Sequence, residues 1–212
     1  MIETKGKLIV GLGLPGSGKS SVMRRAAAIC RSICFVEPEE SEWPDAVRQR
    51  AQVGYATAIT WFRSVRVTSL FKADDLRKNG HIVFVDSFYD KLVSKYLGRR
   101  GMEWLIPPED PYYPVIQLMA ELDYELLPEA DCVVSFNISN DVWLELLKKR
   151  NRQLDADAEL SKTFETQELF YNAAKLYCES NGITHILFRN GTDGVESAAK
   201  RLINQLTDEK VI

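Results

Sequence analysis

Short apolar runs alternate along the chain with longer segments of helical character. The short runs are continuous rather than alternating with polar residues, which is typical of strands that are covered on both faces. They predict strands at residues 7–12, 33–36, 81–85, 132–136 and 183–188. The longer segments predict helices at residues 20–31, 44–78, 113–127, 142–150, 163–180 and 195–206.

Strand alternating with helix predicts an α/β fold, in which a parallel sheet is built from right-handed crossovers and has helices on both faces. The length fits a single domain over residues 1–212. Within it, a polar run between two predicted helices makes residues 150–161 a candidate lid, or else a solvated loop. Ligands of such sheets bind beyond the carboxyl ends of the strands, so the functional site is expected there.

The net charge of −3 narrows the classes of partner. An acidic chain argues against wide contact with a nucleic-acid backbone, which usually needs a basic face.

The apolar run near the amino terminus is too short for a signal peptide or a membrane span. Four scattered cysteines without a CxxC pair, and only two histidines, predict reduced thiols rather than a zinc or redox site. We therefore expect a cytoplasmic protein that binds neither membrane nor nucleic acid.

A glycine-rich loop carries the clearest chemistry. Residues 13–20, GLPGSGKS, fit G-x-x-x-x-G-K-[ST] without departure, directly after the first predicted strand and before the first helix. In that arrangement successive backbone N–H groups converge on phosphate oxygens, and the glycines allow close approach. Lys19 would reach the β- and γ-phosphates, and Ser20 would ligate Mg²⁺ through its hydroxyl. The loop thus predicts ATP and Mg²⁺ as cofactors. The expected phosphate contacts are Gly13, Gly16, Ser17, Gly18, Lys19, Ser20 and Ser21.

Two acidic residues follow predicted strands. Asp86 directly follows the run at residues 81–85, where a carboxylate can hold Mg²⁺ directly or through a water bound to the ion. The alternative is that Asp86 is the N-cap of the next helix. Glu37 ends the second run, on the side from which an acceptor hydroxyl would approach the γ-phosphate, and could take the hydroxyl proton. The alternative here is a solvated acidic loop, which suits Glu39, Glu40 and Glu42 well.

Four stretches resemble the deoxynucleoside kinases and, more distantly, the thymidylate kinases: GLPGSGKSS, VEPEESEW, FVDSFYDKL and KKRNRQLDADAEL. They occur in the family's order and spacing across most of the chain. The resemblance implies a five-stranded parallel sheet in the order 2-3-1-4-5 with a short lid. It also implies that the protein phosphorylates a small hydroxyl-bearing molecule, with a deoxynucleoside as the leading candidate.

The resemblance assigns roles to individual residues. Glu37 matches the family's general base, Trp43 approximates an aromatic wall of the nucleoside pocket, and Asp86 matches an acidic residue at the magnesium edge. Arg150 and Arg152 look like the lid arginines that clamp donor phosphates. On local features alone, these arginines equally suit the negative end of the preceding helix.

The resemblance breaks at the acceptor side. After the third strand the family has an acidic residue, arginine and serine, whereas this chain has Asp86, Ser87 and Phe88, so the expected arginine is absent. Lys91, one helical turn further, could replace its charge but not its bidentate fork. The family's base-reading glutamine has no clear counterpart, and Tyr55 stands in that region as a candidate substrate contact.

The leading hypothesis is phosphoryl transfer from ATP to the hydroxyl of a deoxynucleoside-like molecule, with Lys19, Glu37, Arg150 and Arg152 as catalytic residues. A second hypothesis keeps the donor site and makes the acceptor a nucleoside monophosphate or a non-nucleoside alcohol. A third is a nucleotide-binding regulatory protein without small-molecule kinase activity, because fold does not determine function. A homodimer is compatible with each of them.

Overall fold

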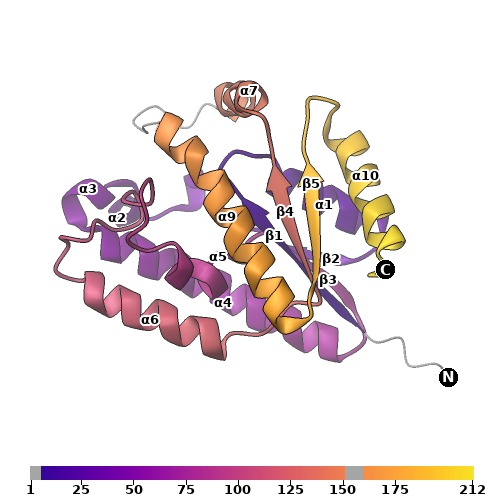
Figure 1. Ribbon diagram of the computed structural model, residues 1–212, viewed down its shortest axis with the longest axis horizontal. Coiled ribbons are helices and arrows are strands. Elements are labelled where there is room, and N and C mark those ends of the chain that lie inside the picture. The colour runs from indigo at the N-terminus through magenta and orange to yellow at the C-terminus, as the bar shows by residue number, and fades with distance from the viewer. Residues whose placement is uncertain (1–5, 151–159) are drawn as a thin grey trace.

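The five predicted strands form one parallel sheet in the computed structural model, which describes residues 6–150 and 160–212 (Figure 1). The strand order is β2-β3-β1-β4-β5, as the resemblance implies. At the centre, β1 places Leu8 beside Val83 of β3 and Val10 beside Val133 of β4. All pairs are parallel, so every carboxyl end lies at the same edge of the sheet. The strands are β1 (Lys7–Gly13), β2 (Ile33–Phe35), β3 (Ile82–Val85), β4 (Cys132–Asn137) and β5 (Thr184–Arg189).

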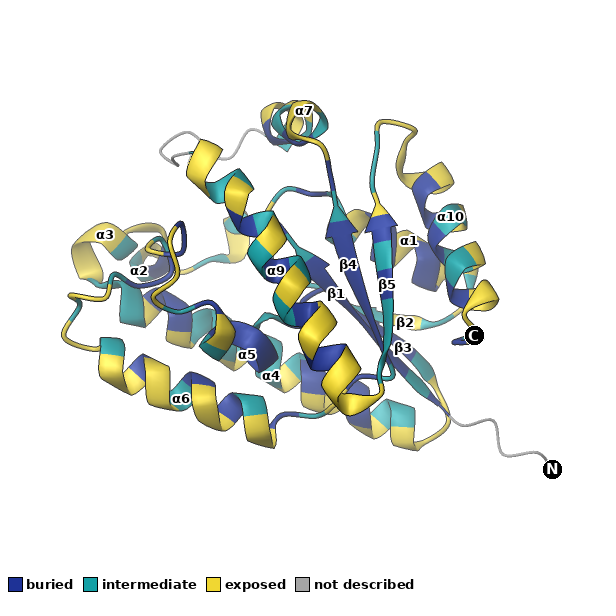
Figure 2. Cartoon of the chain, viewed as in Figure 1, coloured by how far each residue is buried: buried dark blue, intermediate teal, exposed yellow. Residues whose placement is uncertain are grey.

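Helices cover both faces of the sheet (Figure 1). One layer consists of α1 (Lys19–Ile29) and α10 (Val195–Asp208), and the other of α4 (Tyr55–Lys78), α6 (Tyr113–Leu126) and α9 (Leu160–Asn181). Alternate residues of β1 enter the two cores, because side chains of a strand point to opposite faces. Leu8 and Val10 belong to the core that includes residues of α4, α6 and α9, whereas Ile9 belongs to the core that includes residues of α1 and α10. Figure 2 shows that β1, β3 and β4 are largely buried, and that the helices around them are exposed on their outer sides. This confirms the expected fold class.

The predicted helix at residues 44–78 is wrong in its first part. Three helices occupy this range: α2 (Asp45–Arg48), α3 (Arg50–Val53) and α4. Gly54 separates the last two with a φ of 116°, which interrupts an α-helix and which glycine adopts without strain. Three further short helices were not predicted: η1 (Glu40–Glu42), α5 (Tyr89–Leu92) and η2 (Val93–Lys95).

The carboxyl edge of the sheet gathers the loops that carry the predicted site. There β1 runs into the phosphate loop, β2 is followed by Glu37, and β3 is followed by Asp86. After β4, α7 (Asn140–Arg150) ends at Arg150; Arg152 and most of the candidate lid lie outside the described residues.

All four cysteines are free thiols. None of the described helices is long and apolar enough to cross a membrane.

Candidate active site

The phosphate loop has a backbone conformation that requires its glycines. Gly16 and Gly18 adopt φ values of 77° and 82°, in the left-handed region that favours glycine. A Cβ at Gly13 would lie 2.7 Å from the carbonyl oxygen of Phe136 on β4, so the close approach of the neighbouring strand excludes a side chain there. The loop leads directly into α1, and the unpaired N–H groups of the first turn of that helix therefore lie at the loop.

The loop also offers an orphan hydroxyl that suits a polyphosphate. Ser17 is completely buried, and its Oγ has no hydrogen-bond partner among the described residues. A buried hydroxyl without a partner is costly, so an oxygen acceptor bound at this position would stabilise it. Together with the first-turn amides of α1 and the glycine cradle, this hydroxyl fits the triphosphate of ATP.

Asp86, only 2% exposed, forms the inner part of a candidate magnesium site. Its Oδ1 accepts the backbone N–H of Glu37 at 3.1 Å, and its carboxylate hydrogen-bonds with the side chain of Ser20. Burial and the negative charge of Glu37 raise the pKa of Asp86, while Lys19 and the two hydrogen bonds oppose the rise. A buried carboxylate that is short of positive charge, next to the hydroxyl of Ser20, suits Mg²⁺. The alternative N-cap role does not apply, because Phe88 is the N-cap of α5.

An arginine that the sequence analysis did not single out organises the acceptor side. Arg66, on α4, binds both oxygens of Asp90 through Nε and Nη2, at 2.6 and 3.0 Å. Its Nη1 donates to Oε1 of Glu37 at 3.3 Å. The guanidinium also lies over the rings of Phe62 and Tyr89, 5.5 and 5.4 Å from their centroids. We call Glu37, Arg66 and Asp90 the arginine triad.

The arginine triad corrects the expectation that this side of the site lacks an arginine. The position after Asp86 does hold Ser87, which hydrogen-bonds to Glu37, but Arg66 supplies the guanidinium from a different element. Lys91 does not replace it, because its Nζ donates to the carbonyl of Leu127 at 2.6 Å, beyond the end of α6. The signal that could have found Arg66 is an arginine on the inner, apolar side of a predicted helix, where a buried cation needs an acidic partner.

Glu37 is ionised at neutral pH in this setting. Burial alone would raise its pKa, but the charges of Arg66 and Lys19, with hydrogen bonds from Ser87 and Arg66, lower the pKa below its usual value. The side chain remains 35% exposed, so an acceptor can reach it. A carboxylate with a lowered pKa is a weak base, and it is therefore better suited to orient a hydroxyl than to hold its proton.

Trp43 extends the acceptor side along α4. Its Nε1 donates to the carbonyl of Pro38 at 3.0 Å, and its ring meets Phe62 edge-on, with centroids 5.0 Å apart. Phe62 lies one helical turn before Arg66, which brings Trp43 close to the arginine triad. Tyr55 begins α4, about 16 Å of helix axis before Arg66, so the structure does not bring it to the triad.

Arg150 reaches the phosphate loop from the end of α7. A Cβ at Gly16 would lie 3.4 Å from Nη1 of Arg150, which places the guanidinium against the loop. This position is compatible with a residue that contacts donor phosphates, in addition to the favourable position at a helix carboxyl terminus. Ser21, the other predicted phosphate contact, follows Ser20 within α1 and is exposed.

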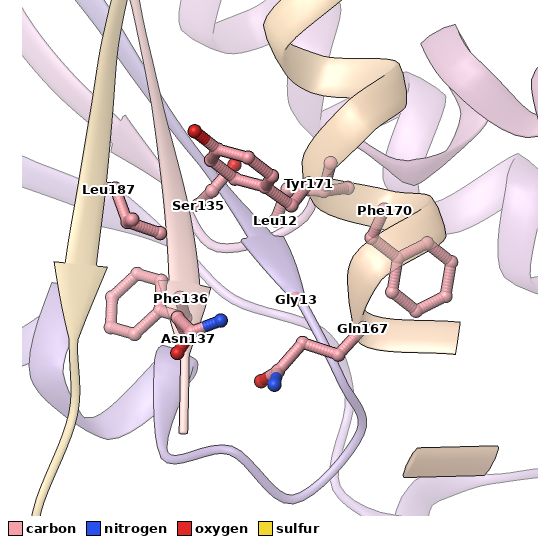
Figure 3. Close-up of a pocket in the computed structure, with 9 residues that line it drawn as sticks. All are labelled: Leu12, Gly13, Ser135, Phe136, Asn137, Gln167, Phe170, Tyr171 and Leu187. Atoms are coloured by element: carbon pink, nitrogen blue, oxygen red, sulfur yellow. The ribbon is translucent and has the colours of Figure 1, made fainter. Parts of the chain in front are cut away.

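Two hollows lie near these residues. Figure 3 shows the first, between α9 and the end of β4, where Gly13 and Asn137 face Gln167 and Phe170. It is a crevice too narrow for a water molecule. The second, beside Glu37 and the end of β3, has room for about one water. Neither hollow, as it stands, encloses a space the size of a nucleobase.

Comparison with known proteins identifies the fold. No protein-family model matches the sequence, and no curated protein matches it. Among solved structures, deoxyadenosine kinase from M. mycoides with bound dATP aligns with a TM-score of 0.68 at 17% identity, over 95% of this chain and 99% of that chain. Thymidylate kinase from Candida albicans aligns with a TM-score of 0.58 at 16% identity, over 97% of this chain and 93% of that one. Identities this low establish the fold alone, and the chain therefore has the fold that these two kinases share.

Proposed function

We propose that the protein transfers the γ-phosphoryl group of ATP, with Mg²⁺, to the hydroxyl of a small molecule, and that the acceptor is a deoxynucleoside. Glu37 carries this proposal, because it is a partly exposed carboxylate on which the charges of both Lys19 in the phosphate loop and Arg66 on the acceptor side act. A protein that only binds nucleotides has no need of such a carboxylate between the two sides. The shared fold supports a deoxynucleoside as the acceptor.

Different residues of the site would bind the phosphate donor and the acceptor. The loop amides and Lys19 would hold the triphosphate, while Ser20 and Asp86 would hold Mg²⁺. ATP supplies the phosphoryl group, and Mg²⁺ neutralises charge on its oxygens. Glu37 accepts a hydrogen bond from the acceptor hydroxyl and so directs its oxygen toward the donor.

Two arginines support the transfer from opposite sides. Arg66 keeps Glu37 ionised and fixes its carboxylate through the hydrogen bond at 3.3 Å. Arg150, against the phosphate loop, would stabilise the charge on the transferring phosphoryl oxygens, and we propose the same role for Arg152. Positioning and charge stabilisation thus account for the rate, because phosphoryl transfer needs little covalent participation by the protein.

The arginine triad favours a neutral acceptor over a nucleoside monophosphate. The guanidinium of Arg66 is already matched by two carboxylates, those of Glu37 and Asp90. A phosphate on the acceptor would add a negative charge beside Glu37, and this arginine has no unmatched charge to offer it. A deoxynucleoside or a non-nucleoside alcohol fits this side without a further cation.

A ligand screen followed by a transfer assay tests the proposal. Thermal shifts are measured with deoxynucleosides, nucleoside monophosphates and small alcohols, each with a non-hydrolysable ATP analogue, because a ligand that binds the native state raises its stability. Transfer of labelled γ-phosphate to the acceptor so identified should be abolished in Lys19→Ala, which removes the charge directed at that phosphate. ATP binding without transfer to any acceptor would favour a regulatory protein. Unchanged turnover in Lys19→Ala would remove the basis of the proposal.

We also propose that α6 mediates a homodimer. This helix presents two apolar stripes, one of which packs in the core. The other, which we call the outer α6 stripe, is between 51% and 73% exposed and consists of Val115, Leu118, Leu122 and Leu126. A contiguous exposed apolar surface marks an interaction site, and a symmetric pair of copies would cover the stripe on each.

A further inference from the structure

Two carbonyl oxygens of the phosphate loop are held by side chains from distant parts of the chain. The indole Nε1 of Trp143 donates to the carbonyl of Pro15 at 2.8 Å. The amide Nδ2 of Asn190 donates to the carbonyl of Ser17 at 2.7 Å. Neither donor belongs to the glycine-rich motif, and the two approach it from different elements, α7 and the segment after β5.

These bonds control the direction of phosphate-facing N–H groups. The carbonyl of one residue and the N–H of the next share a rigid peptide plane, so a bond that fixes the carbonyl also fixes the N–H. The carbonyl of Pro15 shares its plane with the N–H of Gly16, and that of Ser17 with the N–H of Gly18. In a loop that directs N–H groups inward to an anion, the carbonyls point outward, and they need donors of their own.

Trp143 is itself held in place by its surroundings. It is 1% exposed, and its ring lies 5.6 Å, centroid to centroid, from that of Phe164 on α9. The segment before α7 is tied to α9 as well, because Gln167 accepts the N–H of Ile138 at 2.8 Å and donates to the carbonyl of Ile138 at 3.1 Å. Figure 3 shows the Gln167 side chain extending from α9 toward the end of β4. The indole N–H is therefore a fixed donor.

Asn190 is equally well placed. Its backbone N–H donates to the carbonyl of Asn137 at 2.8 Å, which anchors it to the end of β4. A Cβ at Gly18 would lie 2.6 Å from Nδ2 of Asn190, so any other residue at position 18 would displace this amide. The absence of a side chain at Gly18 thus serves the hydrogen bond from Asn190 as well as the backbone conformation of the loop.

We propose that Trp143 and Asn190 are positioning residues of the phosphate loop, whose hydrogen bonds preorganise the N–H groups of Gly16 and Gly18 for a polyphosphate. A preorganised site binds more tightly because less ordering is required on binding. The inference rests on the proposed function only in that the loop binds a polyphosphate, and it is independent of the acceptor. It predicts an effect on donor affinity that a merely structural role would not produce.

Trp143→Phe is the first test, because it removes the donor N–H and keeps a ring to pack against Phe164. Trp104→Phe is the matched control: Nε1 of Trp104 is also buried but has no hydrogen-bond partner among the described residues, so the same substitution removes no such bond. Affinities for Mg-ADP and for inorganic tripolyphosphate are measured by equilibrium dialysis. Trp143→Phe is expected to weaken both about fivefold, the equivalent of one hydrogen bond of about 1 kcal/mol, and Trp104→Phe to change neither.

The outcomes separate this inference from the proposed function. A wild type that binds neither ligand refutes the proposed function. If Trp143→Phe binds tripolyphosphate as tightly as the wild type does, the inference is refuted and the proposed function is unaffected. The same holds if Trp143→Phe binds Mg-ADP more weakly but binds tripolyphosphate with unchanged affinity. If Trp143→Phe does not fold, as judged by circular dichroism, Asn190→Ala carries the test. Asn190→Ala is expected to weaken tripolyphosphate binding about fivefold, and unchanged affinity would refute the inference.

Discussion

Replacing Arg66 with methionine tests the arginine triad. Methionine keeps part of the aliphatic length but no charge, so Asp90 loses both of its bonds from Arg66 and Glu37 loses one. The side chains of Arg66 and Asp90 are only 12% and 8% exposed, so in the variant water cannot replace the guanidinium as the partner of the Asp90 carboxylate. Breaking such a pair costs about 3–5 kcal/mol. In a chain of this size that lowers Tm by roughly 6–20 °C, since each kcal/mol is worth about 2–4 °C.

Arg201→Met is the matched control for this prediction. Arg201 also binds both oxygens of one carboxylate, Asp193, at 3.1 and 3.0 Å, but these two side chains are 43% and 40% exposed. Exposed ion pairs contribute at most about 1 kcal/mol, so a much smaller loss is expected. Urea unfolding of both variants gives the free energies of unfolding. Equal losses in the two variants would refute the claim that burial makes the arginine triad strong.

The same variant should change the dependence of stability on pH. In the wild type the pKa of Glu37 is lowered in the native state. Its contribution to stability is therefore present above the pKa of the unfolded chain and is lost as the pH falls through the native pKa. Because Arg66→Met removes the main opposing charge, the difference in Tm between wild type and variant should be widest above about pH 5 and narrow on acidification. A difference that stays constant down to about pH 3 would contradict this explanation.

Three further predictions concern other parts of the molecule. Because the pKa of Asp86 is raised, its ionised form destabilises the native state at neutral pH, and Asp86→Asn should therefore raise the Tm of the ligand-free protein at pH 7. The same substitution should lower turnover with Mg-ATP by about 100-fold or more. Arg150→Ala should lower kcat about 10- to 100-fold with little change in the KM of the acceptor, and the reverse pattern would place it on the acceptor side. Leu118→Glu with Leu122→Glu should convert a dimer to a monomer in light-scattering chromatography, whereas Leu176→Glu, at an equally exposed leucine of α9, should not.

The strands and the phosphate loop could be predicted because each depends on local sequence, whereas the order of the strands came from the family resemblance. The central strands are buried on both faces, so residues such as Leu8 and Ile9 are both apolar although they point to opposite cores. The loop needs glycines, a lysine and a serine at fixed spacing, which a linear motif records directly. The break at Gly54 was missed, because a single glycine within a helical pattern does not reveal the φ it adopts.

The arginine triad and the supports of the phosphate loop could not be predicted in the same way. Arg66 is separated from Glu37 by 29 residues and from Asp90 by 24, and the three lie on different elements, so no periodic pattern links them. Trp143 and Asn190 reach the loop across 128 and 173 residues of sequence. Their partners are backbone carbonyls, which every residue possesses, so the sequence contains no sign of the contact.

Steady-state kinetics of Glu37→Gln test the central claim, that an ionised Glu37 directs the acceptor hydroxyl toward the donor phosphate. The amide is nearly the same size as the carboxylate and lies outside the phosphate loop, so the fold and the affinity for ATP should be retained. Turnover should fall about 100-fold, the lower end of the range for acid–base assistance, because a carboxylate with a lowered pKa orients the hydroxyl more than it removes the proton. Glu39→Gln, in the same acidic turn, should keep normal turnover. A loss of about tenfold or less in Glu37→Gln, or an equal loss in Glu39→Gln, would contradict the assignment of this role to Glu37.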